Sequence, residues 1–529
     1  MKSSKKKIIV IITILLVVGV LGTTYALWSV SDKSKKIDEV TATCLDIEFS
    51  SEDSGITLND VIPVVDREGL MQEGYTFKIT NKCDSIVRFY LNLESLNISN
   101  DTKYTNIDYI DISLNDDYVE GLGNFNSTTS LLDEGTAYDT RLLEENLIKP
   151  QGTAVYILKV WLDEDTPKTE ANSMWRGKIT VSATTEANSD YLDLNGVQYL
   201  TKLATTNTDE LYYDGASYTD PNTNEEIVDN NLRYMGANPN NYVLFNDELW
   251  RIIGVMNNVD DGSGVKESRI KLIRAESLGQ FPYYDECADE NWTDNGNGTY
   301  TCSSKRYNNN WPNSTVNEIL NDLYWNGKLH EPYHGYMKIN DIWKDSLVEA
   351  DFGNSKINKK TLKYIKEAIY YLGGHNAGIA EYNYLSLISL EWYEAERTNQ
   401  GNNNELTWTG NLGLMYPSDY GYASNGVFNG TDCKEISLYT WNIGENEICK
   451  NSDWLLYLDH LRWTMTPTAD YAERMAIIYN NGPVYGYVKT NEGESITPVL
   501  YLKSNINIIG GTGTSTDPFR INLGVTYEE

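Results

Sequence analysis

The pattern of apolar and polar residues divides the chain into two regions. Between residues 40 and 186, apolar side chains recur at every second position in short runs separated by polar turns. This period is typical of half-buried β-strands, and several such strands in one region predict a β-sandwich. The polar and acidic segment 97–140 is expected to be an insertion or long loops. The strands are expected at residues 45–49, 75–79, 87–93, 156–162 and 179–183.

From about residue 189 the pattern becomes mixed. Thr315 and Glu318 have the spacing of a capping box, and a second helix is expected at 359–372, with a third beginning at Ser389. Strands together with separate helices predict an α+β domain. The first of these helices carries an apolar stripe of Val316, Ile319, Leu320 and Leu323. The strands are expected at 231–235, 242–245, 249–256, 269–275, 476–479, 484–488 and 498–502.

The N-terminus has the features of a secretory signal. Four lysines precede an almost wholly apolar stretch at 8–21, and the small residues Thr24 and Ala26 follow it. This arrangement predicts cleavage by signal peptidase between Ala26 and Leu27. Retention as a membrane anchor stays open, because the apolar stretch approaches the length of a bilayer span. The expected domains are therefore 1–26, 27–188 and 189–529, with the last two outside the cytoplasm.

The six cysteines agree with an extracellular location, where disulfides form and persist. Pairing each cysteine with the next one along the chain keeps every bridge within one group of secondary-structure elements. The alternative is that the cysteines are free, buried thiols. The predicted pairs are Cys44–Cys83, Cys287–Cys302 and Cys433–Cys449.

The charge balance excludes one class of partner. The chain has 43 Lys and Arg against 76 Asp and Glu, a net charge of −33. A protein that binds nucleic acid needs a basic face, so nucleic acid is not expected as a partner of this acidic chain. Acidic pairs such as Asp116–Asp117 and Asp260–Asp261 could hold calcium, although a solvated acidic surface is the commoner meaning of such pairs. No other cofactor is expected.

Three short segments of the first region resemble the TasA/camelysin family of secreted bacterial matrix-fibre proteins. They are residues 22–29 (GTTYALWS), Leu45-Asp46-Ile47 and 179–184 (ITVSAT). The resemblance implies a protein without a catalytic site, processed by a dedicated signal peptidase and able to polymerise with other copies of itself. After cleavage, the extended segment 27–31 could donate a strand to the open sheet edge of a neighbouring copy.

Four segments of the second region resemble uncharacterised C-terminal domains of secreted Gram-positive surface proteins. They are residues 414–423, 463–467, 496–502 and 510–519. Those domains are distantly similar to the C-type-lectin or formylglycine-generating-enzyme fold, and no activity transfers from them. The resemblance implies a loop that stacks on sugar rings, with internal packing as the alternative. The candidate residues are Trp408, Tyr416, Asp419, Tyr420 and Tyr422.

Two further motifs are interpreted as structural. His330 and His334 match the HExxH pattern of zinc proteases, but Pro332 lies inside the turn that would have to be helical. The glycines of 510–513 lack the lysine and the following helix of a phosphate-binding loop, so a turn between strands is expected.

These observations favour a non-enzymatic protein of the cell surface or the extracellular space of a Gram-positive-type bacterium. Its role would be matrix or wall association, or adhesion through the second domain, with surface glycans or other copies of itself as partners. A secreted hydrolase or modifying enzyme that acts through the second domain is the alternative, and a purely structural fibre subunit is a third possibility.

Overall fold

A computed structural model gives the fold for most of the chain. It describes residues 45–49, 56–59, 61–97, 103–170, 173–284, 286–287, 292–294, 300–302, 305–325, 333–334, 337–339, 342–344, 349–350, 357–378, 380–401, 405–456 and 460–525. The predicted signal segment 1–26 and its cleavage site lie outside these residues. Within them, no helix combines the length and the apolar character needed to cross a membrane.

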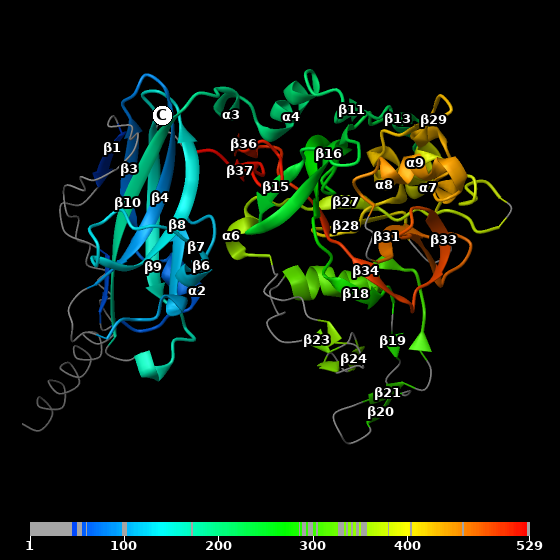
Figure 1. Ribbon diagram of the computed structural model, residues 1–529. Coiled ribbons are helices and arrows are strands. Elements are labelled where there is room, and N and C mark those ends of the chain that lie inside the picture. Colours follow the sequence, from blue (N-terminus) through cyan, green and yellow to red (C-terminus); the bar gives the residue numbers. More distant parts are fainter. Residues whose placement is uncertain are drawn as a thin grey trace, which may run out of the picture. The chain divides into compact units, whose positions relative to one another are not determined.

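The chain divides into two compact units (Figure 1). Unit 1 comprises Met1–Ser189 with Gly524–Glu529, and unit 2 comprises Asp190–Leu523. Both are rich in antiparallel sheets, which confirms the β-rich character expected of the chain.

Unit 1 contains two five-stranded antiparallel sheets that share one apolar core. The core joins the sheets directly, since the ring of Phe89 in one sheet lies 6.2 Å from the ring of Tyr156 in the other. The alternation predicted for this region thus produces two layers that face each other. One sheet has the order β1 (Leu45–Phe49), β3 (Tyr75–Asn81), β9 (Thr153–Leu162), β5 (Ile110–Leu114) and β6 (Glu120–Gly121). The other has the order β2 (Ile56–Asn59), β10 (Met174–Glu186), β4 (Ile86–Leu96), β8 (Ala137–Ile148) and β7 (Asn126–Ser127).

The expectation that 97–140 is an insertion or long loops holds only in part, because the segment also contains a strand of the core. This segment supplies β5, which pairs with β9, and its Ile110, Ile112 and Leu114 are buried in the core. The polar part that follows is fixed by a buried carboxylate, because Glu94 accepts a hydrogen bond of 2.9 Å from the backbone N–H of Leu131. Local polarity therefore concealed a short strand with the same period as its neighbours.

Unit 2 is built around two larger sheets. The first has the order β11 (Leu211–Tyr213), β14 (Leu232–Tyr234), β16 (Glu248–Val259), β17 (Glu267–Arg274) and β35 (Val499–Tyr501), with β15 (Tyr242–Phe245) also on β16. The second has the order β18 (Gly279–Pro282), β34 (Gly493–Ile496), β31 (Arg462–Pro467), β32 (Arg474–Ile478) and β33 (Val484–Lys489). The strands expected in this region all occur, with ends shifted by a few residues.

The helices of unit 2 agree only in part with expectation. Helix α5 (Thr315–Glu318) begins one residue earlier than predicted, because Ser314 is the N-cap and accepts a 3.0 Å bond from the N–H of Asn317. It continues as the π-helical turn η6 (Ile319–Tyr324), and the predicted apolar stripe is buried. Helix α7 (Ser389–Thr398) begins where expected.

The helix predicted at 359–372 was wrong. A short helix, α6 (Lys359–Leu362), is followed by strand β27 (Ala368–Tyr371), which pairs with β28 (Thr407–Gly410). The sequence Ala-Ile-Tyr-Tyr of β27 favours a strand once a partner is present, and that partner comes from a segment almost 40 residues later in the chain. The helical spacing of the apolar residues could not reveal this pairing.

Candidate functional site

A buried group of opposite charges lies where β14, β16 and β17 meet helix α8 (Pro417–Ala423). On these strands, Arg233 is paired with Gly254, and Gly254 is paired with Lys271. Arg233 and Lys271 therefore flank a residue that has no side chain, on the same face of the sheet. Both reach Asp419 of α8, with Arg233 Nη1–Oδ1 at 2.8 Å and Lys271 Nζ–Oδ2 at 2.5 Å.

The charges in this group are balanced and almost fully buried. Asp214 completes it, with its Oδ2 2.6 Å from Arg233 Nε. Burial acts to raise the pKa of Asp419, but the charges of Lys271 and Arg233 outweigh it and lower that pKa to about 2. Asp419 is thus held as a carboxylate and acts as a fixed acceptor for both cations.

A second layer consists of tyrosines around Arg397 of α7. The guanidinium carbon lies 3.2 Å from the ring centroid of Tyr393 and 4.7 Å from that of Tyr371. The hydroxyl of Tyr371 is 3.0 Å from that of Tyr218. Asp229 accepts a hydrogen bond from the Tyr393 hydroxyl and lies 3.9 Å from Arg397 Nε. The stacking holds the Arg397 guanidinium in one plane.

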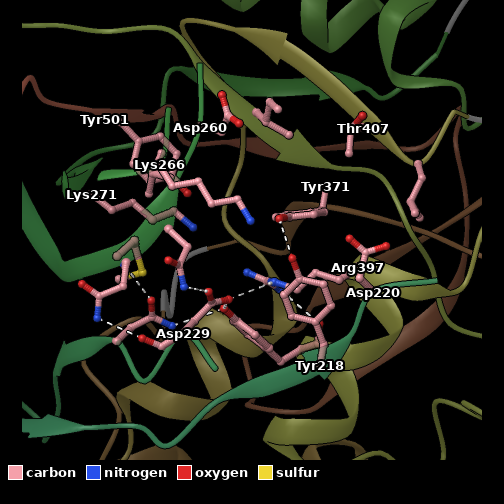
Figure 2. Close-up of a pocket in the computed structure, with 18 of the residues that line it drawn as sticks. Tyr218, Asp220, Asp229, Asp260, Lys266, Lys271, Tyr371, Arg397, Thr407 and Tyr501 are labelled. Carbon is pink, nitrogen blue, oxygen red and sulfur yellow. Dashed lines mark hydrogen bonds and ion pairs between the residues drawn. The ribbon is translucent and has the colours of Figure 1, made fainter. Parts of the chain in front are cut away.

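These two layers border a cavity of about 190 Å³ (Figure 2). Figure 2 shows the side chains of Lys266 and Arg397 extending from different elements toward its interior. Lys266 is exposed and has no carboxylate at ion-pair distance among the residues that the structure describes. Other polar groups of the lining are Asp220, Asn222, Asn257, Asn258, Asp260 and Thr407.

Glu396 lies behind this cavity and not in its lining. It accepts hydrogen bonds from the backbone N–H of Ser418 at 2.9 Å and from the Ser418 hydroxyl at 2.5 Å. Burial raises the pKa of Glu396 to about 7, so this carboxyl titrates near neutral pH. Its position couples α7 to the start of α8.

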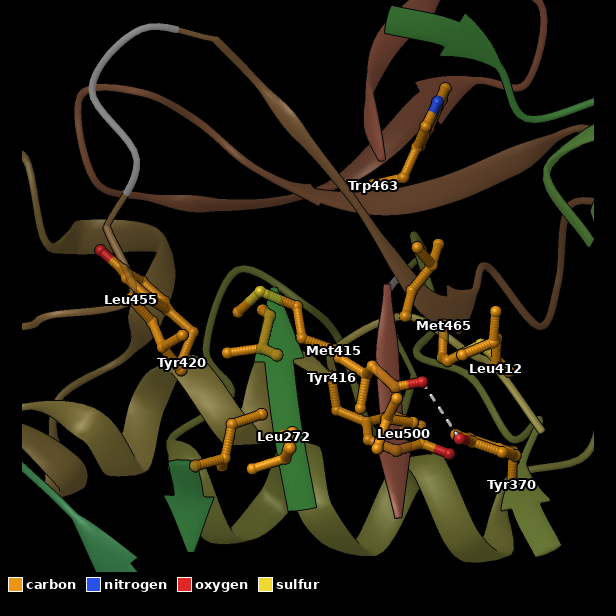
Figure 3. Close-up of a cluster of buried hydrophobic side chains, with 14 of the residues drawn as sticks. Leu272, Tyr370, Leu412, Met415, Tyr416, Tyr420, Leu455, Trp463, Met465 and Leu500 are labelled. Atoms are coloured by element: carbon orange, nitrogen blue, oxygen red, sulfur yellow. Dashed lines mark hydrogen bonds between the residues drawn. The ribbon is translucent and has the colours of Figure 1, made fainter. Parts of the chain in front are cut away.

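Of the ligand loop predicted from the sequence, only Asp419 lines the cavity. Tyr416 and Tyr420 are buried among leucines and methionines (Figure 3). Tyr422 is also buried, with its ring 4.9 Å from the guanidinium carbon of Arg233. Trp408 is half-buried, and its ring lies 5.6 Å from that of Trp311. The structure thus places these four aromatic residues in internal packing.

Sequence reasoning missed most of the residues that form the cavity. A signal was nevertheless present, because Arg233 lies between Leu232 and Tyr234 and Lys271 between Ile270 and Leu272, each flanked by residues of buried type. Charged residues are rarely fully buried unless they are paired. Two such residues in strands of one sheet predict a buried counter-ion, although the sequence does not identify it as Asp419.

The other candidate sites have the following places in the fold. His334 lies in strand β23 (Tyr333–His334), whereas His330 is outside the described residues. Asp116 and Asp261 form ion pairs of 2.8 and 2.9 Å with Lys159 and Lys366. No cluster of three or more potential metal ligands occurs in the described part of the chain, and calcium binding stays a prediction. Gly510 ends β36 (Asn507–Gly510), and Gly511 and Gly513 lie in the connection to β37 (Arg520–Asn522).

The predicted disulfides are confirmed at one pair. Cys433 and Cys449 are bonded, with a Cα–Cα distance of 5.3 Å. Cys83 is disulfide-bonded, but Cys44 lies outside the described residues. Cys287 and Cys302 lie in β19 (Glu286–Cys287) and β21 (Tyr300–Cys302). The pairings Cys44–Cys83 and Cys287–Cys302 therefore stay predictions.

Comparisons of the whole chain with known proteins found no match among protein-family models, characterised proteins or solved structures. The resemblances noted above consequently rest on short motifs alone, and the function has to be argued from the cavity.

Proposed function

We propose that this is a secreted or cell-surface recognition protein without catalytic activity, and that the cavity in unit 2 binds one sugar unit of a surface glycan. Unit 1 would attach the protein to matrix or wall. A lectin-like role for unit 2, and the C-type-lectin-like fold with it, belong to this proposal. The observation that carries the proposal is the open polar cavity bounded by Arg397, its tyrosines and Lys266.

The size and chemistry of the cavity suit a single polar ring. Its volume of about 190 Å³ is below the roughly 300–1,000 Å³ of pockets that take drug-sized ligands. The lining offers donors from Lys266 and Arg397 and acceptors from Asp220 and Asp260, together with the amides of four asparagines. A sugar hydroxyl donates and accepts at once, so a lining of both kinds can satisfy it.

The carboxylates of the cavity favour binding over hydrolysis. Asp419 contacts two cations, and Asp229 accepts bonds from Tyr393 and, at 2.8 Å, from Asn258 Nδ2. A general acid must be able to hold and release a proton near the working pH. Glu396 has such a pKa but does not line the cavity. A hydrolase would therefore have to use Asp220 or Asp260, the two other carboxylates of the lining, as its acid.

The proposal is tested by titrating the full-length protein against a panel of immobilised monosaccharides and bacterial wall glycans. The double variant Lys266→Ala/Thr407→Val changes two exposed residues of the lining and should weaken binding of any hit at least about tenfold. Lys489→Ala, an exposed lysine of β33, is the matched control and should bind normally.

Two outcomes would contradict the proposal. The first is that no glycan in the panel binds, and the second is that the double variant binds as well as the control. Bound glycans recovered after incubation should also be unchanged in mass, because cleavage would favour the hydrolase.

A further inference from the structure

A second cavity in unit 2 contains an arginine that has no acid at ion-pair distance among the described residues. This cavity measures about 470 Å³ and shares no lining residue with the first. Arg251 of β16 lies in its wall, where its guanidinium carbon is 4.4 Å from the ring centroid of Tyr242 and 4.3 Å from that of Trp454. Both rings lie within the distance of a cation–π contact and help to hold the guanidinium in place.

The hydrogen bonds of Arg251 leave part of its donor fork unused. Nε donates to Asn241 Oδ1 at 2.8 Å, Nη1 to the carbonyl of Trp454 at 3.4 Å, and Nη2 to the carbonyl of Pro239 at 3.4 Å. All three acceptors are neutral. Since a guanidinium has five N–H groups, one N–H remains on each terminal nitrogen.

The surroundings of Arg251 do not neutralise it. Arg274 lines the same cavity and is paired with Glu248 at 2.6 Å, but no carboxylate lies at ion-pair distance from Arg251 in the described part of the chain. The nearby Asp453 is not at ion-pair distance from Arg251, and burial raises the pKa of that carboxyl well above its usual value. Burial lowers the pKa of Arg251 to about 10, which still leaves it charged at neutral pH. A desolvated charge without a counter-ion is costly.

We propose that this cavity binds a small organic carboxylate, which pairs with the free edge of the Arg251 guanidinium. Two N–H groups on adjacent terminal nitrogens match the two oxygens of a carboxylate. The exposed Glu276 in the lining opposes a doubly charged phosphate more strongly than a singly charged carboxylate. The apolar side chains of Leu249, Ile273, Leu455 and Leu456 also line the cavity and would contact a short apolar group on the ligand.

The test uses the full-length protein and three probes, namely hexanoate, hexanol and inorganic phosphate. Hexanoate and hexanol have the same apolar chain and differ in the head group. Isothermal titration, supported by intrinsic tryptophan fluorescence to which Trp454 beside Arg251 contributes, should report saturable binding of hexanoate, with hexanol at least about tenfold weaker. Equal binding of the two, or no hexanoate binding up to about 10 mM, would overturn the proposal. Tighter binding of phosphate than of hexanoate would assign the cavity to a phosphate group and would equally overturn the carboxylate assignment.

Arg251→Lys retains the positive charge but removes the paired N–H groups of the guanidinium. This variant should bind hexanoate at least about tenfold more weakly and should bind hexanol with unchanged affinity. The matched control Arg67→Lys changes an exposed arginine of unit 1 and should have no effect. Unaltered hexanoate affinity in Arg251→Lys would count against the proposal. If that variant does not fold, the comparison of the three probes on the natural protein decides.

Discussion

Arg233 and Lys271 approach the same carboxylate from either side of Gly254 and contact its two oxygens separately. This relationship needs three strands in one register and a residue without a side chain between the two cations. A buried pair of cations is stable only when acids offset both charges, and here Asp419 and Asp214 do so. The sheet and helix α8 are therefore joined by charge as well as by apolar packing.

The first prediction concerns the glycine between these cations. An added Cβ at Gly254 would lie 2.1 Å from the carbonyl oxygen of Leu232, which belongs to the backbone of the adjacent strand and cannot move aside easily. Gly254→Ala should therefore reduce the free energy of unfolding by about 1–3 kcal/mol. Urea denaturation followed by tryptophan fluorescence measures this change.

The matched control is Gly493→Ala. Gly493 also lies in a strand, β34, but no heavy atom lies within 4 Å of its added Cβ. This variant should change the free energy of unfolding by less than about 0.5 kcal/mol. Similar losses in both variants would show that the spacing of β14 and β16 around Gly254 is not the cause.

The second prediction concerns the loss of stability at acidic pH. The pKa of Asp419 is about 2 in the folded chain against about 3.9 in an unfolded one. A lowered folded-state pKa stabilises the fold at pH values above the unfolded pKa, and this contribution is lost as the pH falls from about 4 toward 2. The difference in unfolding free energy between the natural protein and Asp419→Asn should therefore shrink by about 2–3 kcal/mol over that range.

Asp432→Asn is the control variant for the effect of acidic pH on stability. Asp432 pairs with Lys434 at 2.9 Å, but its side chain is 41% exposed, and exposed pairs contribute little. Its effect should stay within about 0.5 kcal/mol at every pH. A constant difference between the natural protein and Asp419→Asn from pH 6 to pH 2 would contradict the argument.

Much of the fold could be predicted from local patterns. The alternating runs at 75–79 and 242–245 became strands because burial on one face of a sheet requires a period of two. The predictions failed where pairing over long distances decided the outcome. Strand β27 takes its partner from β28, and β5 takes its partner from β9, so neither could be identified from its own residues.

The cavity was harder to predict than the fold. Its residues come from β12 (Ser217–Thr219), β14, β16, β17, β27, β28, β35, α7 and α8, and the lining extends in the sequence from Tyr218 to Tyr501. The loop chosen from the sequence was rich in aromatic residues, but a tyrosine can serve a core as well as a ligand. Asp419 was found and its partners were not, since the counter-ions of a buried carboxylate depend on the tertiary structure.

The last prediction concerns Glu396. Burial raises its folded-state pKa to about 7, whereas an unfolded chain ionises this group near pH 4.3. The folded state thus retains a proton that the unfolded state has already released, so this contribution to stability is fully present below about pH 4 and is lost as the pH rises through about 7.

Glu396→Gln keeps a neutral acceptor for the N–H of Ser418 and does not titrate. Relative to the natural protein, this variant should therefore gain about 2–3 kcal/mol of unfolding free energy between pH 5 and pH 8. Urea titrations at the two pH values measure the gain, with the exposed Glu405→Gln as a control that should show none. A parallel pH dependence in Glu396→Gln and the natural protein would mean that this carboxyl is already ionised in the fold, and that another group holds α7 against α8.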